Sequence, residues 1–159
     1  ICEQIDFAVL NAEFHIYGAG GEQEAIEQYI TSHPNKGIFY HGKVSRDEVP
    51  AVLAKHDCTL IPLVKNIYGA VPSKIYESMA AGLPILFAGE GEGARIVVEN
   101  QLGWVSASKD YATLTQNIQK AVIGEDRETI RTHCIECARN KFNRPKQISK
   151  LYDFLSQLN

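Results

Sequence analysis

Apolar residues along the chain gather in short continuous runs, and longer stretches with a helical period separate these runs. Glycine, proline or polar residues bound the runs, which have the length and composition of β-strands. Alternation of such strands with amphipathic helices is typical of parallel sheets that carry helices on their faces. The run at 58–63 contains no charged residue, which predicts a strand buried on both faces. The predicted strands are 14–17, 37–42, 58–63, 84–88 and 103–105.

The stretches between the strands place apolar residues three and four positions apart, which predicts helices. Ser45 and Glu48 have the spacing of a capping box, so we expect a helix that begins there and ends at about 56. Gly82 is placed to close the helix that follows Pro72. The segment 5–10 reads as part of a helix that precedes the first strand. The other predicted helices are 22–32, 94–100, 111–122, 129–141 and a terminal helix at about 146–158.

The terminal helix is amphipathic, and its apolar residues are expected to face inward. These residues are Ile148, Leu151, Phe154, Leu155 and Leu158.

These elements predict a Rossmann-like, three-layer α/β/α fold with a parallel sheet, in one domain that spans 1–159. A doubly wound sheet ordinarily opens with a βα unit, and no strand precedes the segment 5–10. The first residue is Ile1 rather than a methionine. We therefore expect the chain to be a fragment that is truncated at its N-terminal end.

Composition and charge argue against several classes of protein. The chain has 159 residues, of which 45% are apolar, and this is enough for one well-formed core. A net charge of -3, with no dense cluster of Lys or Arg, argues against a nucleic-acid partner. No apolar run approaches the roughly 20 residues of a membrane-spanning helix, so no transmembrane segment is expected.

The cysteines and histidines suggest little chemistry of their own. Cys134 and Cys137 lie three residues apart in a predicted helix, so they share a face. Buried or half-buried thiols are favoured over a metal site, because no second pair supplies the remaining ligands. Few, scattered cysteines favour reduced thiols and a cytoplasmic location. The histidines show no pairing that resembles a catalytic dyad, and Trp104 is expected in the core.

In open parallel sheets, ligands bind beyond the carboxyl ends of the strands, and two glycine-rich loops are candidates for that rim. The loop 18–22 (GAGGE) would let backbone N–H groups approach an anion at a helix N-terminus. A dinucleotide fingerprint would need another glycine at 23, where the chain has Gln23. The residues alone leave an anion-binding loop and a tight turn equally open. For the loop 89–93, the residues likewise do not distinguish a ligand lid from a surface turn.

The segment 72–77 is more informative. Lys74 stands in the first turn of a predicted helix, where the helix dipole disfavours a cation, so an anionic partner would explain it. Glu77, one turn on, offers two acceptor oxygens suited to a pair of ribose hydroxyls. The alternative is a solvated Lys74–Glu77 ion pair, which stabilises a helix by only about 0.2–0.5 kcal/mol. Both readings stay open on the residues alone.

Several motifs occur in the order found in one known family. They are the strand with its glycines at 14–20, the next strand and exit loop at 38–44, and the strand at 57–62. The most specific is KIYESMAAGLPIL at 74–86. Together they resemble the C-terminal, nucleotide-sugar-binding half of the GT-B retaining glycosyltransferases known as glycosyl transferases group 1.

This resemblance implies a donor site. It makes Glu77 the ligand of the donor ribose, and it places Ser73 and Lys74 near the diphosphate or the sugar. It implies no metal and no cofactor besides the nucleotide-sugar donor, expected to be a UDP-sugar, and it leaves the catalytic residues unknown. The residues that it implies around the base and nucleotide are Gly18, Gly20, Val44 and Ser45.

The chain departs from the family pattern in two respects. The family has a further glutamate eight residues before Glu77, and this chain has Gly69 there. The loop 68–74 instead resembles a subset that acts in bacterial surface polysaccharide assembly. The Arg and Lys that bind the diphosphate in the family should precede residue 1, as should the acceptor-binding domain.

The resemblance therefore implies the donor-binding half of a glycosyltransferase of bacterial surface polysaccharide or glycan biosynthesis, which would be inactive by itself. The missing N-terminal domain would bind a glycan or lipid-linked acceptor and hold the cytoplasmic protein at the inner membrane. One alternative is part of a GT-B nucleotide-sugar epimerase, for which no acid–base side chains are identified. Another is a non-catalytic α/β nucleotide-binding or interaction module.

Overall fold

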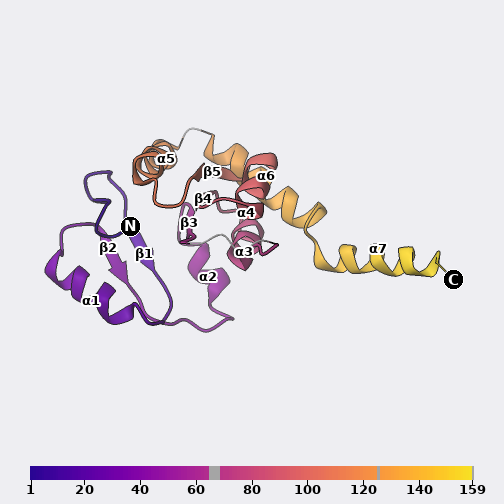
Figure 1. The fold of residues 1–159 in the computed structure, drawn as a ribbon, viewed down its shortest axis with the longest axis horizontal. Coiled ribbons are helices and arrows are strands. Elements are labelled where there is room, and N and C mark those ends of the chain that lie inside the picture. The colour runs from indigo at the N-terminus through magenta and orange to yellow at the C-terminus, as the bar shows by residue number, and fades with distance from the viewer. Residues whose placement is uncertain (65–68, 125, 159) are drawn as a thin grey trace.

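A computed structural model of the chain describes residues 1–64, 69–124 and 126–158, and strands and helices alternate along most of it (Figure 1). The strands are β1 (Phe14–Ile16), β2 (Ile38–Tyr40), β3 (Thr59–Pro62), β4 (Ile85–Ala88) and β5 (Gly103–Ser106). The helices are α1 (Gln23–Ser32), α2 (Val49–Leu53), α3 (Ser73–Ala80), α4 (Glu92–Glu99), α5 (Tyr111–Ile123), α6 (Arg127–Asn140) and α7 (Arg144–Ser156).

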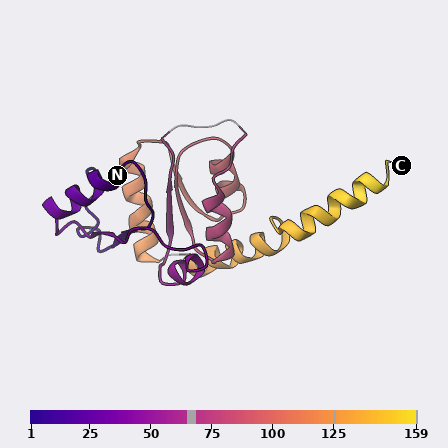
Figure 2. The same ribbon diagram turned by 90° about the horizontal axis from the view of Figure 1, so that it is seen from below.

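All strand pairs are parallel, as the alternation of elements predicts, but they form two sheets rather than one. β1 pairs with β2, and β3, β4 and β5 form a second sheet in that order. Helices connect consecutive strands, because a parallel pair needs a long crossover. Around the three-stranded sheet, α5 covers one face, and α3 and α4 cover the other (Figure 2). The predicted Rossmann-like α/β class is confirmed.

The core is built on β4, the central strand of the larger sheet, in which every residue is buried. Ile85 and Phe87 pack in the cluster that includes the buried residues of α3, α4 and α6, and Leu86 and Ala88 pack toward α5. The sequence predicts full burial for the run 58–63, but in β3 only Ile61 is buried. The reason is position, since β3 lies at an edge of its sheet and β4 has a neighbour on each side.

The segment before β1 differs from its prediction. Residues 5–10 contain no helix, and turns occupy 7–10. Ile5 and Phe7 are nevertheless buried in the cluster under α5, and the backbone N–H of Phe7 donates to the carbonyl of Lys36. The apolar spacing of this segment thus reports burial rather than helical structure.

The terminal helix is present, but the predicted direction of its apolar face is wrong. The side chain of Asn143 caps α7 by accepting from the N–H of Lys146. Figure 1 shows α7 extending away from the rest of the molecule. Leu151 is 56% exposed and Phe154 is 58% exposed, so the stripe expected to face inward lies in solvent. Amphipathic periodicity identifies the apolar face of a helix but not what covers it.

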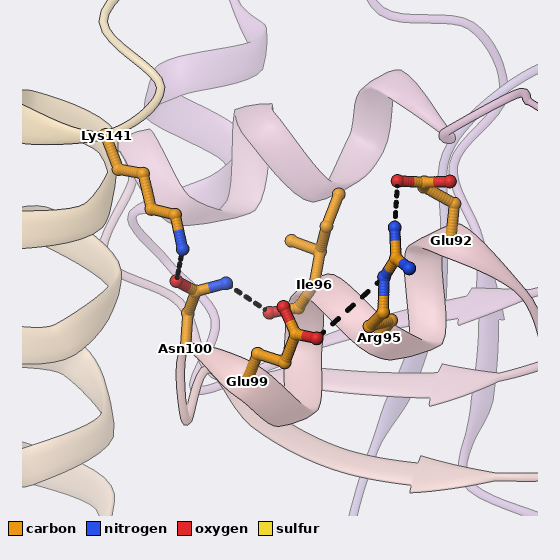
Figure 3. Close-up of polar contacts among 6 residues, drawn as sticks. All are labelled: Glu92, Arg95, Ile96, Glu99, Asn100 and Lys141. Atoms are coloured by element: carbon orange, nitrogen blue, oxygen red, sulfur yellow. Dashed lines mark hydrogen bonds and ion pairs between the residues drawn. The ribbon is translucent and has the colours of Figure 1, made fainter.

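The α4 helix, which begins in the loop 89–93, is held at both ends (Figure 3). Near its start, the guanidinium of Arg95 donates to Glu92 at 2.6 Å. At its end, the ammonium of Lys141 donates to the amide oxygen of Asn100 at 2.7 Å, which connects α4 to the end of α6. A Cβ on Gly93 would lie 2.7 Å from the ring of Phe87, so α4 begins in close contact with β4.

Candidate functional site

The carboxyl ends of strands from both sheets meet around one groove of about 470 Å³. Ile16 at the end of β1, Pro62 at the end of β3 and Ala88 at the end of β4 all line it. Residues from α1, from the start of α5 and from the chain start complete its walls. A crevice beyond the carboxyl ends of parallel strands is where open α/β sheets bind their ligands.

The glycine loop after β1 is fixed to the end of β2. The N–H of Gly18 donates to the carbonyl of Gly42 at 2.8 Å, and the hydroxyl of Tyr40 donates to the carbonyl of Gly18. Gly18 has a φ of +145°, a conformation that side chains rarely adopt. Gly20 is exposed, and a Cβ there would meet nothing within 4 Å, so the surface above this loop is open.

The segment after β2 does not form the predicted capping box at the start of a helix. The N–H and the hydroxyl of Ser45 both donate to the carboxylate of Glu48, at 2.9 and 2.7 Å. These hydrogen bonds lower the pKa of the Glu48 carboxyl group. The helix begins only at Val49, so Ser45 is not its N-cap, and Pro50 lies in its first turn. Val44, which precedes Ser45, is half-buried.

The N-terminus of α3 carries the other predicted donor residues. Pro72 is the N-cap, and no side chain caps the first turn. The positive end of the helix dipole at Ser73 and Lys74 is therefore not balanced by a capping side chain. The ammonium of Lys74 lies 2.9 Å from the carboxylate of Glu77, with 65% and 39% of the two side chains exposed. The structure therefore contains the solvated ion pair, and the Glu77 carboxylate is accessible.

The core holds α3 rigidly in place. Ile75 and Met79 are fully buried, and the hydroxyl of Ser78 donates to the carbonyl of Lys74. Gly82, with a φ of +68°, ends the helix in a Schellman motif, with Leu83 N–H donating to Ser78 and Gly82 N–H donating to Met79. The core therefore fixes the position of the first turn of α3, and the exposed side of this turn faces solvent.

The structure joins the predicted residues into two groups. The Gly18–Gly42 hydrogen bond brings the loop at 18–20 beside the segment that leads to Val44 and Ser45. Ser73, Lys74 and Glu77 form a second group on α3. Within the described part of the chain, no hydrogen bond links one group to the other. Tyr68, in the loop that resembles a polysaccharide-assembly subset, lies outside the described residues.

Sequence reasoning missed a histidine cluster. Nδ1 of His15 and Nε2 of His41 lie 2.8 Å apart, and the rings of His15 and His56 have centroids 5.0 Å apart. His56 also contacts the hydroxyl of Tyr17 at 3.3 Å. The residues alone did not indicate that these histidines pack together. The register of β1 against β2 explains the contact. His15 lies opposite Phe39, and His41 is two residues after Phe39, so His15 and His41 are near each other on the same face.

This cluster predicts an acid-sensitive component of stability. Burial, reinforced by the charges of His15 and His41, lowers the pKa of His56. The folded state therefore binds fewer protons than the unfolded state as pH falls below the ordinary histidine value of about 6.5, and the folded state loses stability there. We expect urea unfolding at pH 7.5 and pH 5.5 to show a smaller acid-induced loss for His56→Gln than for the parent.

His33→Gln removes a histidine outside the cluster and is the matched control for that comparison. An equal acid-induced loss in the parent and in His56→Gln would show that His56 does not contribute to the effect.

The cysteines are free thiols, as expected from their spacing. Cys134 is fully buried and donates to the carbonyl of Leu83, and burial raises the pKa of its thiol to about 12. Cys137, on the same helix face, is half-buried. Among the described residues, no group of His, Cys, Asp and Glu has the arrangement of a metal site.

A further feature of the rim is an unpaired hydroxyl. Ser106, at the carboxyl end of β5, is 3% exposed, and its hydroxyl has no hydrogen-bond partner among the described residues. Trp104, two residues earlier, is predicted in the core; it is half-buried and packs against both core clusters.

Comparison with known proteins establishes the family. The model of the family described as glycosyl transferases group 1 matches residues 1–123. The chain belongs to this family. The matched residues include both glycine-bearing rim segments and α3, and they end with α5.

Individual relatives agree with this assignment. The probable glycosyltransferase WbjE of Pseudomonas aeruginosa is 31% identical over 112 residues, which are 69% of this chain and 28% of WbjE. The pneumococcal O-GlcNAc transferase GtfA, solved with UDP and GlcNAc, superposes with a TM-score of 0.74 at 18% identity, over 98% of this chain and 32% of GtfA. Anabaena HepE, solved with UDP, gives a TM-score of 0.76 at 19% identity, over 98% of this chain and 44% of HepE.

GtfA and HepE share the fold of this chain, so the predicted GT-B fold class is confirmed. The chain spans less than half the length of each of these three relatives. Within the described ranges, none of its helices has both the length and the apolar character needed to cross a bilayer.

Proposed function

We propose that residues 1–159 form the donor-binding part of a glycosyltransferase and that the donor is a UDP-sugar. The observation that carries this proposal is the first turn of α3. It has no side-chain cap, and the core holds it fixed. Lys74 lies in this turn and Glu77 lies one turn on, and both have accessible charged groups. An uncapped helix N-terminus with a nearby cation suits a diphosphate, and a carboxylate one turn on suits the hydroxyls of a ribose.

UDP is favoured as the nucleotide because GtfA and HepE, which share this fold, were solved with UDP, and HepE also with UDP-glucose. In this proposal the ribose displaces Lys74 from Glu77, and the ammonium turns toward the phosphates. The exposed ion pair is worth little by itself, so breaking it costs little. Gly18, Gly20, Val44 and Ser45 would contact the base and nucleotide from the other side of the rim.

The chemistry assigned to this part of the enzyme is electrostatic. Departure of the sugar leaves negative charge on the diphosphate, and Lys74 with the N–H groups of α3 would stabilise that charge as it develops. Because the chain covers only part of its relatives, we assign acceptor binding to residues outside 1–159. A role in bacterial surface polysaccharide assembly is part of the proposal and is supported by the resemblance of the loop 68–74.

An NMR titration with UDP, with GDP as the comparison nucleotide, tests this proposal. We expect UDP to shift the amide signals of 18–22, Val44 and 73–77, with a Kd on the order of 1 mM for this chain, or about -4 kcal/mol. The complete polypeptide should bind more tightly through the same residues. Shifts confined to other surfaces, or none in the complete polypeptide, would contradict the donor site.

A further inference from the structure

The exit of β2 holds both backbone polar groups of Gly18, the first residue of the glycine loop. The N–H of Gly18 donates to the carbonyl of Gly42 at 2.8 Å, and the carbonyl of Gly18 accepts from the hydroxyl of Tyr40. Gly18 lies two residues beyond the end of β1, so both hydrogen bonds lie outside the paired strands. A surface loop ordinarily leaves many such groups to water. The start of this loop is instead fixed at two points.

The pairing of β1 with β2 places Tyr40 where its hydroxyl reaches this carbonyl. Tyr40 is the last residue of β2 and lies opposite Ile16 of β1. Side chains alternate along a strand, so the side chains of paired residues stand on the same face of the sheet. From this face the half-buried phenol of Tyr40 reaches the carbonyl of Gly18, two residues after Ile16.

We propose that Tyr40 is a positioning residue of the donor site. Its hydroxyl holds the glycine loop against the exit of β2, in the arrangement that accepts the nucleotide. Tyr40 acts through Gly18 and does not itself touch the donor. This inference rests on the proposed function, because it takes the glycine loop to be one wall of the UDP site.

The composition of the loop explains why it needs such a constraint. Residues 18–21 are GAGG, and Gly20 and Gly21 are exposed, with nothing within 4 Å of a Cβ built on either. Glycine loses more backbone freedom on ordering than any other residue. A ligand that has to order a free glycine loop therefore binds more weakly than one that meets an ordered loop. A hydrogen bond that fixes Gly18 before the ligand arrives lowers this cost.

The same hydrogen bonds join the two segments assigned to the base and nucleotide. Gly42, whose carbonyl accepts from Gly18, is followed two residues later by Val44. Among the described residues, no further hydrogen bond links 18–21 to 40–45. Removing the hydroxyl of Tyr40 would therefore leave one of the two hydrogen bonds that hold these segments together.

Tyr17 offers a matched control on the opposite face of the same strands. It directly precedes Gly18, and its ring stacks on that of His41 with centroids 4.5 Å apart. Its hydroxyl contacts His56 at 3.3 Å. Tyr17→Phe and Tyr40→Phe thus each remove one hydroxyl close to the same glycine, but only Tyr40→Phe releases the carbonyl of that glycine.

Isothermal titration calorimetry with UDP in the complete enzyme tests the proposal. We expect Tyr40→Phe to weaken UDP binding by roughly 2- to 10-fold, the range set by the net value of one hydrogen bond. Tyr17→Phe should stay within about twofold of the parent. Unchanged affinity in Tyr40→Phe, or an equal loss in the two variants, would overturn the positioning role and leave the donor site in place. A parent enzyme that does not bind UDP would contradict the proposed function, and the positioning role with it.

Amide hydrogen exchange separates positioning from a general loss of structure. Without nucleotide, we expect 18–21 to exchange faster in Tyr40→Phe than in the parent, with α3 unchanged. With saturating UDP, the slowing of exchange at 18–21 should be smaller in Tyr40→Phe, and the slowing at 73–77 should be kept. Equal changes at the two segments, or parental exchange at 18–21 without nucleotide, would overturn the proposal. Circular dichroism verifies that both variants are folded.

Discussion

Replacing Glu77 by glutamine in the complete enzyme is expected to weaken UDP binding by roughly 10- to 150-fold. Hydrogen bonds to a charged group contribute about 1.5–3 kcal/mol, and each 1.4 kcal/mol is a factor of ten in affinity. Glutamine keeps the shape of the side chain but removes the charge and one acceptor. Isothermal titration calorimetry with UDP measures the effect directly.

The fold should be unaffected by this substitution, because the Lys74–Glu77 pair is exposed. Such pairs contribute only about 0.2–0.5 kcal/mol to a helix. Glu99→Gln is the matched control, since Glu99 is also a helical glutamate in an exposed ion pair, with Arg95, at the far end of α4. Unchanged UDP affinity in Glu77→Gln, or an equal loss in Glu99→Gln, would refute the role assigned to Glu77.

Replacing Gly103 by alanine is expected to prevent stable folding. A Cβ at Gly103 would lie 2.1 Å from the carbonyl oxygen of Ile85 and 2.6 Å from its nitrogen, and the φ of Gly103 is +147°. The two residues are partners in the ladder between β4 and β5, and β4 is buried throughout, so neither backbone has room to move. We expect a loss of more than about 4 kcal/mol, out of the roughly 5–15 kcal/mol that stabilise a typical domain.

Gly21→Ala is the matched control for this substitution. Gly21 is exposed, and a Cβ there meets nothing within 4 Å, so its effect should stay within about 0.5 kcal/mol. Urea unfolding followed by circular dichroism compares the two variants. If Gly103→Ala unfolded at the same urea concentration as the parent, the close approach of β5 to β4 would be wrong.

Much of the secondary structure was predictable from local pattern. The apolar runs identified each of the strands, and the spacing of apolar residues identified α1, α3, α5 and α6 to within a few residues. Gly82 marked the end of α3 because a left-handed residue is needed there, and glycine adopts that conformation without strain. Local patterns succeed where the cause of the structure lies within a few residues.

The failures share a different cause. Ile5 and Phe7 have helical spacing but pack as turns under α5, and the apolar stripe of α7 is exposed. The run 58–63 is as apolar as a central strand but lies at a sheet edge. In each case the apolar residues were identified correctly, and their environment was not. That environment is set by elements distant in the sequence.

The sequence by itself determined the class of fold and the position of α3 with its charged residues, because periodicity, capping residues and side-chain charge act over a few positions. It also indicated the family, because the order of the motifs along the chain can be recognised without knowing which residues are in contact. Only the tertiary structure decided that β4 is the buried centre, that three histidines meet, and that the described strands fall into two sheets. These outcomes depend on which strands share hydrogen bonds. Such pairings join residues that are far apart along the chain, so no local sequence pattern predicts them.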